Sequence, residues 1–165
     1  MSTGKTLLDG IPHHPAFDDG LRALERQDYA GALGYFHVAE QQADDQDPLL
    51  TRYRSFLGLA MVLSGDPSGV ELCRHAAYFE TEDPRIFLNL ARVERLVGDR
   101  RRLVEALRAG LRIAPEDPGL LALRDEIGWR RPPPVRWLHR DHPLNRWLGR
   151  CSYRWRHRRE ALPVV

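Results

Sequence analysis

Prolines placed to begin helices recur along the chain at nearly constant intervals. They are separated by 33, 36 and 34 residues and are Pro15, Pro48, Pro84 and Pro118. Aspartates in short turns recur at similar intervals, with steps of 38 and 33 residues, and are Asp28, Asp66 and Asp99. Proline suits the first turn of a helix because its missing N–H would have no partner there. Two series of signals with one period near 34 residues predict a repeated helical hairpin.

The clearest unit of this repeat is residues 84–117. Its first half carries an apolar stripe with steps of 4, 3 and 4 residues, formed by Ile86, Leu90, Val93 and Val97. Such spacing predicts an amphipathic helix. After Gly98 and Asp99 a second apolar run follows, which Pro115 ends.

One hairpin of this size cannot bury its apolar stripe alone, so consecutive hairpins must stack. We therefore predict an all-α solenoid domain over 13–129. Its three helix-turn-helix repeats span about 13–46, 51–83 and 84–117, and a capping helix at 118–129 covers the open end. Residues 1–12 are expected to form a flexible arm.

The chain resembles the tetratricopeptide repeat (TPR) family at the positions where paired helices cross. The family has small residues there, matched by Gly20, Gly58 and Ala91 at one site, by Ala32 at a second, where Val70 and Leu103 depart from the pattern, and by Ala39, Ala77 and Gly110 at a third. Phe36 and Leu107 match a large position of the second helix, where Arg74 departs from the pattern. The resemblance covers about 13–128 and implies a right-handed superhelix.

The resemblance also implies that the first helix of each hairpin lines a concave groove. By family position, the groove residues are Phe17, Leu21, Arg52, Ser55, Leu59, Arg85, Leu88, Asn89, Arg92 and Arg95. This groove would be apolar at its N-terminal end and basic at its C-terminal end. Because a guanidinium binds carboxylates through two parallel hydrogen bonds, we expect a protein or peptide partner, including an acidic one. An alternative is that these arginines only pair with neighbouring acids.

The charge of the chain is divided between its two parts. Residues 1–128 hold 15 basic and 21 acidic side chains, whereas the rest of the chain holds ten arginines and two acids. All four tryptophans also lie beyond residue 128. Such asymmetry indicates an interaction segment.

We predict a Pro/Arg-rich linker over 130–142 and a basic, Trp-rich amphipathic helical tail over 143–165. The tail residues expected to make contacts are Arg146, Trp147, Arg150, Trp155, Arg158 and Arg159. Four interpretations stay open for it. The tail docks on its own or a sister chain, inserts into a partner protein as a helix, lies on an anionic membrane surface, or binds nucleic acid.

No stretch of the sequence is apolar for long enough to span a membrane, and no secretory signal is evident. Two cysteines, Cys73 and Cys151, do not form a disulfide framework. We expect a cytoplasmic protein, with peripheral attachment at the inner face of a membrane as an option. Lys5 is the only lysine, and this arginine bias suggests a bacterial source.

No motif for a nucleophile, a metal site or a cofactor is present, so we expect no catalysis, no metal and no cofactor. Cys73 lies on an apolar stripe and is expected in the core. The predicted function is that of a non-catalytic adaptor or scaffold, with the tail as a second contact. The alternatives are a membrane- or nucleic-acid-associated protein anchored by the tail, and a small TPR chaperone.

Overall fold

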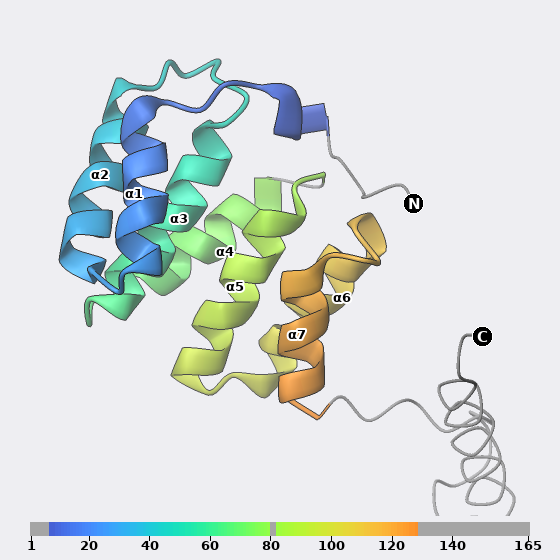
Figure 1. Ribbon diagram of the computed structural model, residues 1–165. Coiled ribbons are helices and arrows are strands. Elements are labelled where there is room, and N and C mark those ends of the chain that lie inside the picture. Colours follow the sequence, from blue (N-terminus) through green and yellow to red (C-terminus); the bar gives the residue numbers. More distant parts are fainter. Residues whose placement is uncertain (1–6, 80–81, 129–165) are drawn as a thin grey trace, which may run out of the picture. The chain divides into compact units, whose positions relative to one another are not determined.

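The computed structural model describes residues 7–79 and 82–128, which form a short 3-10 helix, η1 (Leu7–Gly10), and seven α-helices without any strand. The α-helices are α1 (Pro15–Glu25), α2 (Tyr29–Gln42), α3 (Leu50–Leu63), α4 (Gly69–Phe79), α5 (Pro84–Val97), α6 (Arg100–Ile113) and α7 (Pro118–Glu126). Figure 1 follows them from blue to orange. The all-α fold class predicted from the sequence is confirmed.

Aspartates begin most of these helices by accepting hydrogen bonds from otherwise unpaired backbone N–H groups. The capping side chains before α2, α5, α6 and α7 are Asp28, Asp83, Asp99 and Asp117. Helices α3 and α4 begin two residues later than the prolines suggested. There Asp47 and Asp66 accept from the N–H two residues ahead, so Pro48 and Pro67 lie in turns before the helices.

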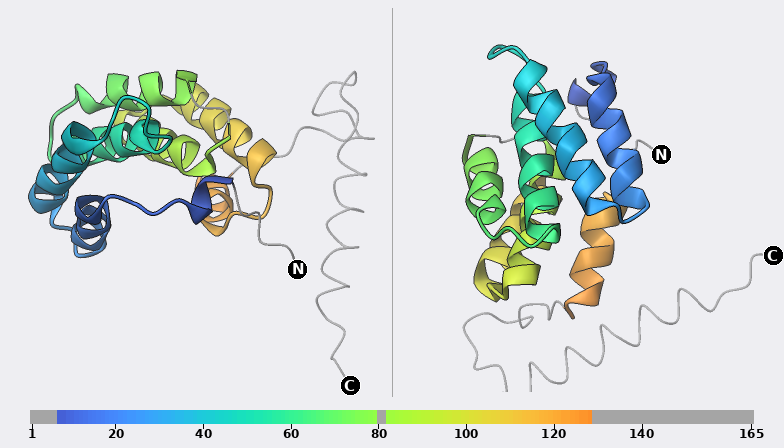
Figure 2. Two further views of the ribbon diagram at one scale, coloured as in Figure 1. Left: turned by 90° about the horizontal axis from the view of Figure 1, so that it is seen from above. Right: turned by 90° about the vertical axis from the view of Figure 1, so that its left-hand side faces the viewer.

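The helices pack as consecutive hairpins, α1 with α2, α3 with α4 and α5 with α6. Neighbouring hairpins meet through contacts of α2 with α3 and of α5 with both α3 and α4, and α7 packs on α5 and α6. Figure 2 shows these helices from two further sides. The hairpins and α7 belong to one compact unit that ends at Ile127.

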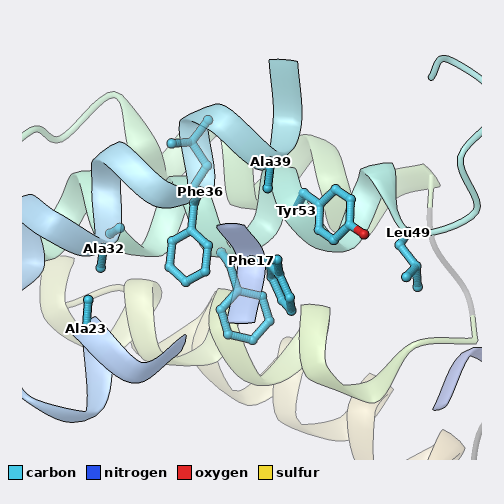
Figure 3. Close-up of a cluster of buried hydrophobic side chains, with 10 residues drawn as sticks. Phe17, Ala23, Ala32, Phe36, Ala39, Leu49 and Tyr53 are labelled. Atoms are coloured by element: carbon cyan, nitrogen blue, oxygen red, sulfur yellow. The ribbon is translucent and has the colours of Figure 1, made fainter. Parts of the chain in front are cut away.

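An aromatic cluster forms the core of the first hairpin and its junction with α3. Phe17 lies at its centre, with ring centroids 5.4 Å from Phe36, 4.9 Å from Tyr53 and 5.1 Å from Phe56. Figure 3 shows the rings of Phe17, Phe36 and Tyr53 gathered between helices. Phe17 is completely buried. The resemblance implied that Phe17 lines a groove. The structure instead places it in the core.

Small residues allow the paired helices to approach closely, at the sites that the resemblance implied. A Cβ added at Gly20 would lie 2.5 Å from the Phe36 ring. A Cβ added at Gly58 would lie 2.7 Å from the carbonyl oxygen of Gly69 and 2.8 Å from Cys73 Sγ. Ala91, at the matching site of the third hairpin, is completely buried.

The chain before α1 is partly folded against the first repeat. Leu8 and Ile11 pack on the aromatic cluster, and the His14 N–H donates to Tyr53 Oη at 3.0 Å. The described part of the arm predicted for 1–12 therefore covers an apolar surface of the first repeat. Among the described residues, no helix combines the length and apolar character needed to cross a bilayer.

Substituting Gly58 by Ala is expected to lower the free energy of unfolding by about 1–3 kcal/mol, because the new methyl group overpacks the α3–α4 contact against backbone. Gly34, on an exposed part of α2 with open space around it, is the matched control. Gly34→Ala should raise stability by up to about 1 kcal/mol through helix propensity. Chemical denaturation followed by circular dichroism measures both values. An unchanged Gly58→Ala midpoint would contradict the close approach.

Candidate functional site

A hollow of about 500 Å³ lies between the first helices of the three hairpins. Its lining comes from α1, α3 and α5, with one residue from the start of α2, and comprises Leu21, Leu24, Glu25, Tyr29, Phe56, Leu59, Leu63, Arg92, Arg95 and Leu96. Most of these side chains are aliphatic or aromatic. The charged ones are Glu25 on α1 and the two arginines on α5.

The lining residues occupy matching positions in the three hairpins. The residue directly after the small crossing residue is Leu21 in α1, Leu59 in α3 and Arg92 in α5. The residue four positions further on is Glu25, Leu63 or Leu96. The hollow is therefore one repeated surface whose chemistry changes from aliphatic to cationic between the second and third hairpins.

The structure divides the predicted groove residues into two groups. Leu59, Arg92 and Arg95 line the hollow, as does Leu21. The other six predicted residues do not line it, and these are Phe17, Arg52, Ser55, Arg85, Leu88 and Asn89. Leu88 packs close to Gly119 at the start of α7.

Arg52 links the second and third hairpins through a buried ion pair. Its side chain is 1% exposed, and its Nε donates to Asp83 Oδ2 at 2.5 Å, where Asp83 is completely buried. Its Nη1 lies 3.1 Å from His13 Nε2. Because a guanidinium only donates, this His13 nitrogen accepts, so Nδ1 carries the proton and donates to Asp18 at 3.1 Å.

Ser55 and Asn89 form a second buried contact between α3 and α5. The Asn89 Nδ2 donates to Ser55 Oγ at 3.2 Å, and both side chains are inaccessible to solvent. With Arg52 they hold neighbouring hairpins together. In this conformation a partner in the hollow has no side-chain surface of these three residues to bind.

Arg92 and Arg95 differ in their electrostatic surroundings. Arg95 Nη1 forms an ion pair with Glu126 of α7. Arg92 is exposed and forms no ion pair within the described parts of the chain. Loss of water around its guanidinium lowers the Arg92 pKa, the charge of Arg95 lowers it further, and Asp117 opposes this shift. Arg92 nevertheless stays a cation, since arginine is protonated throughout the physiological range.

A buried carboxylate that the sequence analysis missed is Glu94. Its side chain is 0% exposed and accepts from Arg74 Nε at 2.7 Å and Nη2 at 3.0 Å. Arg74 is the residue that departs from the family pattern at a position where Phe36 and Leu107 are buried. The arginine at this position could have predicted the buried Glu94 from the sequence, because a cation at a packing position requires a buried acid as its partner.

A second hollow of about 550 Å³ lies over α4, α5 and α6, and includes Arg74, Glu94 and Tyr78 in its lining. Tyr78 is 80% exposed.

Within 7–79 and 82–128, no group of three His, Cys, Asp or Glu side chains is placed to hold a metal ion. The predicted tail residues and Cys151 lie outside the described residues.

Cys73 is completely buried, as its apolar stripe predicted, and its Sγ donates to the Ser55 carbonyl oxygen at 3.3 Å. Burial raises the pKa of the thiol to about 12, and Glu94 adds to the shift. A thiol in this environment is neutral and shielded, which makes it a packing residue.

No protein-family model matches the sequence, and no curated protein matches it. Among solved structures, the chain is similar to the crystal structure of PcrH in complex with the chaperone binding region of PopB. The TM-score is 0.51 at 18% sequence identity, and the match covers 68% of this chain and 89% of the other. At this identity the likeness concerns the fold alone, and it agrees with a TPR-like arrangement of helical hairpins.

Replacing Arg52 by Met is expected to cost about 3–5 kcal/mol of stability, because Asp83 is left buried without its cation. Adding Asp83→Asn removes that charge, keeps an N-cap acceptor for α5, and should recover part of the loss. Arg92→Met is the control and should change stability by less than about 0.5 kcal/mol. Denaturant unfolding measures all three variants. Equal stabilities of Arg52→Met and Arg92→Met would show that the Arg52–Asp83 ion pair does not stabilise the fold.

In a Cys151→Ser variant, the Cys73 thiol should resist a disulfide reagent at neutral pH while the protein is folded. Its raised pKa keeps the thiolate scarce, and burial blocks access. Labelling should begin only with denaturant, in step with the loss of helicity. Rapid stoichiometric labelling of the folded protein would contradict the buried position of Cys73.

Proposed function

We propose that this protein binds a segment of another protein in the hollow between α1, α3 and α5, without catalysing a reaction. The observation that carries the proposal is that three hairpins contribute matching positions to one surface, which is largely apolar and exposes Arg92. A hollow of this size fits a few side chains of a peptide. TPR family membership and a cytoplasmic setting belong to the same proposal and rest on the sequence.

Affinity in the hollow would come mainly from apolar contact. Leu21, Leu24 and Leu63 are only partly covered, and Leu96 is 52% exposed at the edge of the hollow. Each methylene that a ligand covers contributes roughly 0.8 kcal/mol before the cost of ordering the ligand. A segment with a few aliphatic side chains therefore suffices for binding.

A second candidate is a small chaperone that holds a segment of an incompletely folded client. The PcrH structure favours it, since its name describes a bound chaperone binding region of PopB. Both candidates use the same hollow. They differ in the state of the partner, because an adaptor joins folded proteins whereas a chaperone protects a segment that is unstable alone.

Replacing Leu96 by Asp should abolish binding of a partner segment that has been identified by affinity purification and mapped to a peptide. The change places a carboxylate at the apolar edge of the hollow, while the exposure of Leu96 leaves the fold intact. Tyr78→Asp, in the second hollow, is the matched control and should bind normally. Calorimetric titration gives both affinities. Equal binding by the two variants would move the site away from the hollow.

The state of the mapped segment separates the two candidates. For a chaperone, the segment expressed alone should be unfolded or insoluble, and co-expression should raise its soluble yield several-fold. That gain should disappear with Leu96→Asp. A partner that is folded, soluble and unaffected by co-expression would contradict the chaperone and favour the adaptor.

A further inference from the structure

We infer that Arg92 is the receptor for a carboxylate group on an otherwise aliphatic segment bound in the hollow. The inference rests on the proposed function and defines the chemistry of the segment that this site accepts. Four observations support it, namely the position of Arg92 in the repeat, its lack of an ion pair, the engagement of the neighbouring cations and the placement of Glu25.

Arg92 stands where the other two hairpins carry leucine. Leu21 and Leu59 supply the same position of the hollow from α1 and α3. Packing alone would be served by a third aliphatic side chain. A guanidinium at this position instead turns one end of an apolar surface into a site with five N–H donors and no acceptor.

The guanidinium of Arg92 is exposed, so its N–H donors are accessible to a ligand. No acidic side chain of the described residues forms an ion pair with it, and the charge of Arg95 lies nearby. Partial loss of water and the adjacent charge of Arg95 disfavour the cation and lower its pKa, whereas Asp117 opposes this shift. A carboxylate would offset both effects through two parallel, charge-assisted hydrogen bonds.

The other arginines predicted for the groove are engaged elsewhere. Arg52 is buried against Asp83, and Arg95 pairs with Glu126 on α7. Arg85 lies in the first turn of α5 and does not line the hollow. In the described part of the chain, Arg92 is therefore the lining cation that offers its donors to a ligand.

Glu25 defines the direction of the bound segment. It lines the hollow on α1, at the position that Leu63 and Leu96 occupy in the other hairpins. Its negative charge disfavours a ligand carboxylate near α1, whereas Arg92 favours one near α5. The aliphatic side chains of the ligand are thus expected toward α1 and α3, and its carboxylate toward α5. The carboxylate belongs either to an Asp or Glu side chain or to a C-terminus.

The test selects ligands from two random libraries of short peptides, one with blocked and one with free C-termini, against the full-length protein. Selected peptides are then synthesised as the acid, as the Asp→Asn or Glu→Gln form and with an amidated C-terminus. Their affinities are measured for the wild type, for Arg92→Gln and for Arg101→Gln. Arg101 is 87% exposed on α6 and controls for loss of one positive charge, which matters because the whole chain is basic.

We expect the selected peptides to combine aliphatic residues with a carboxylate. Arg92→Gln should weaken their binding about tenfold, and removal of the peptide carboxylate should do the same. The two changes together should cost no more than either alone, because they remove one interaction. Arg101→Gln should change affinity less than about twofold. Sensitivity to C-terminal amidation or to the side-chain amide identifies the source of the carboxylate.

Two results overturn the inference in distinguishable ways. If peptides bind in a manner that Leu96→Asp abolishes but Arg92→Gln leaves unchanged, Arg92 is not the receptor and the proposed function stands. If the wild type selects no peptide that Leu96→Asp disrupts, the proposed function itself fails and this inference fails with it.

Discussion

The packing of the three hairpins depends on a buried ion pair between Arg52 and Asp83. Arg52 belongs to the second hairpin, Asp83 precedes the third, and His13 joins the pair from the segment before the first. A charge buried in this way is strongly destabilising when its partner is removed. Asp83 also caps α5. The same carboxylate thus fixes both the start of a helix and its contact with the hairpin before it.

The contacts of Arg52 also separate the buried polar residues of α3 from the residues that line the hollow. In α3, the polar residues Arg52 and Ser55 are buried in contacts between hairpins, whereas the apolar residues from Phe56 to Leu63 on the facing side line the hollow, with Leu63 only partly covered. In α5, buried Asn89 likewise precedes the lining residues. The polar residues near the helix starts hold hairpins together, and the residues that line the hollow follow them along the helix.

The period, the caps and the small crossing residues were sufficient to predict the hairpins from the sequence. They are local signals, since a capping aspartate and its target lie within a few residues. The roles of Arg52 and Ser55 could not be predicted in the same way. Their partners lie 31 and 34 residues away, in the connection before α5 and in α5 itself. Family position placed them in a groove, but tertiary contacts cover them.

The third hairpin differs from the others because its first helix carries charge where they are apolar. Glu94 stands at the position of Ala23 and Met61, and Arg92 at that of Leu21 and Leu59. Glu94 is compensated within the chain, since Arg74 replaces the aromatic or aliphatic residue expected opposite it and binds it through two hydrogen bonds.

Arg92 has no such counterpart among the described residues and faces the hollow. Both substitutions replace apolar packing by charge, and only one of them is balanced within the protein. The packing of the hairpins gives no reason for a cation at the Arg92 position, where the other two hairpins carry leucine. The asymmetry agrees with the inference that a ligand supplies to Arg92 the carboxylate that Glu94 supplies to Arg74.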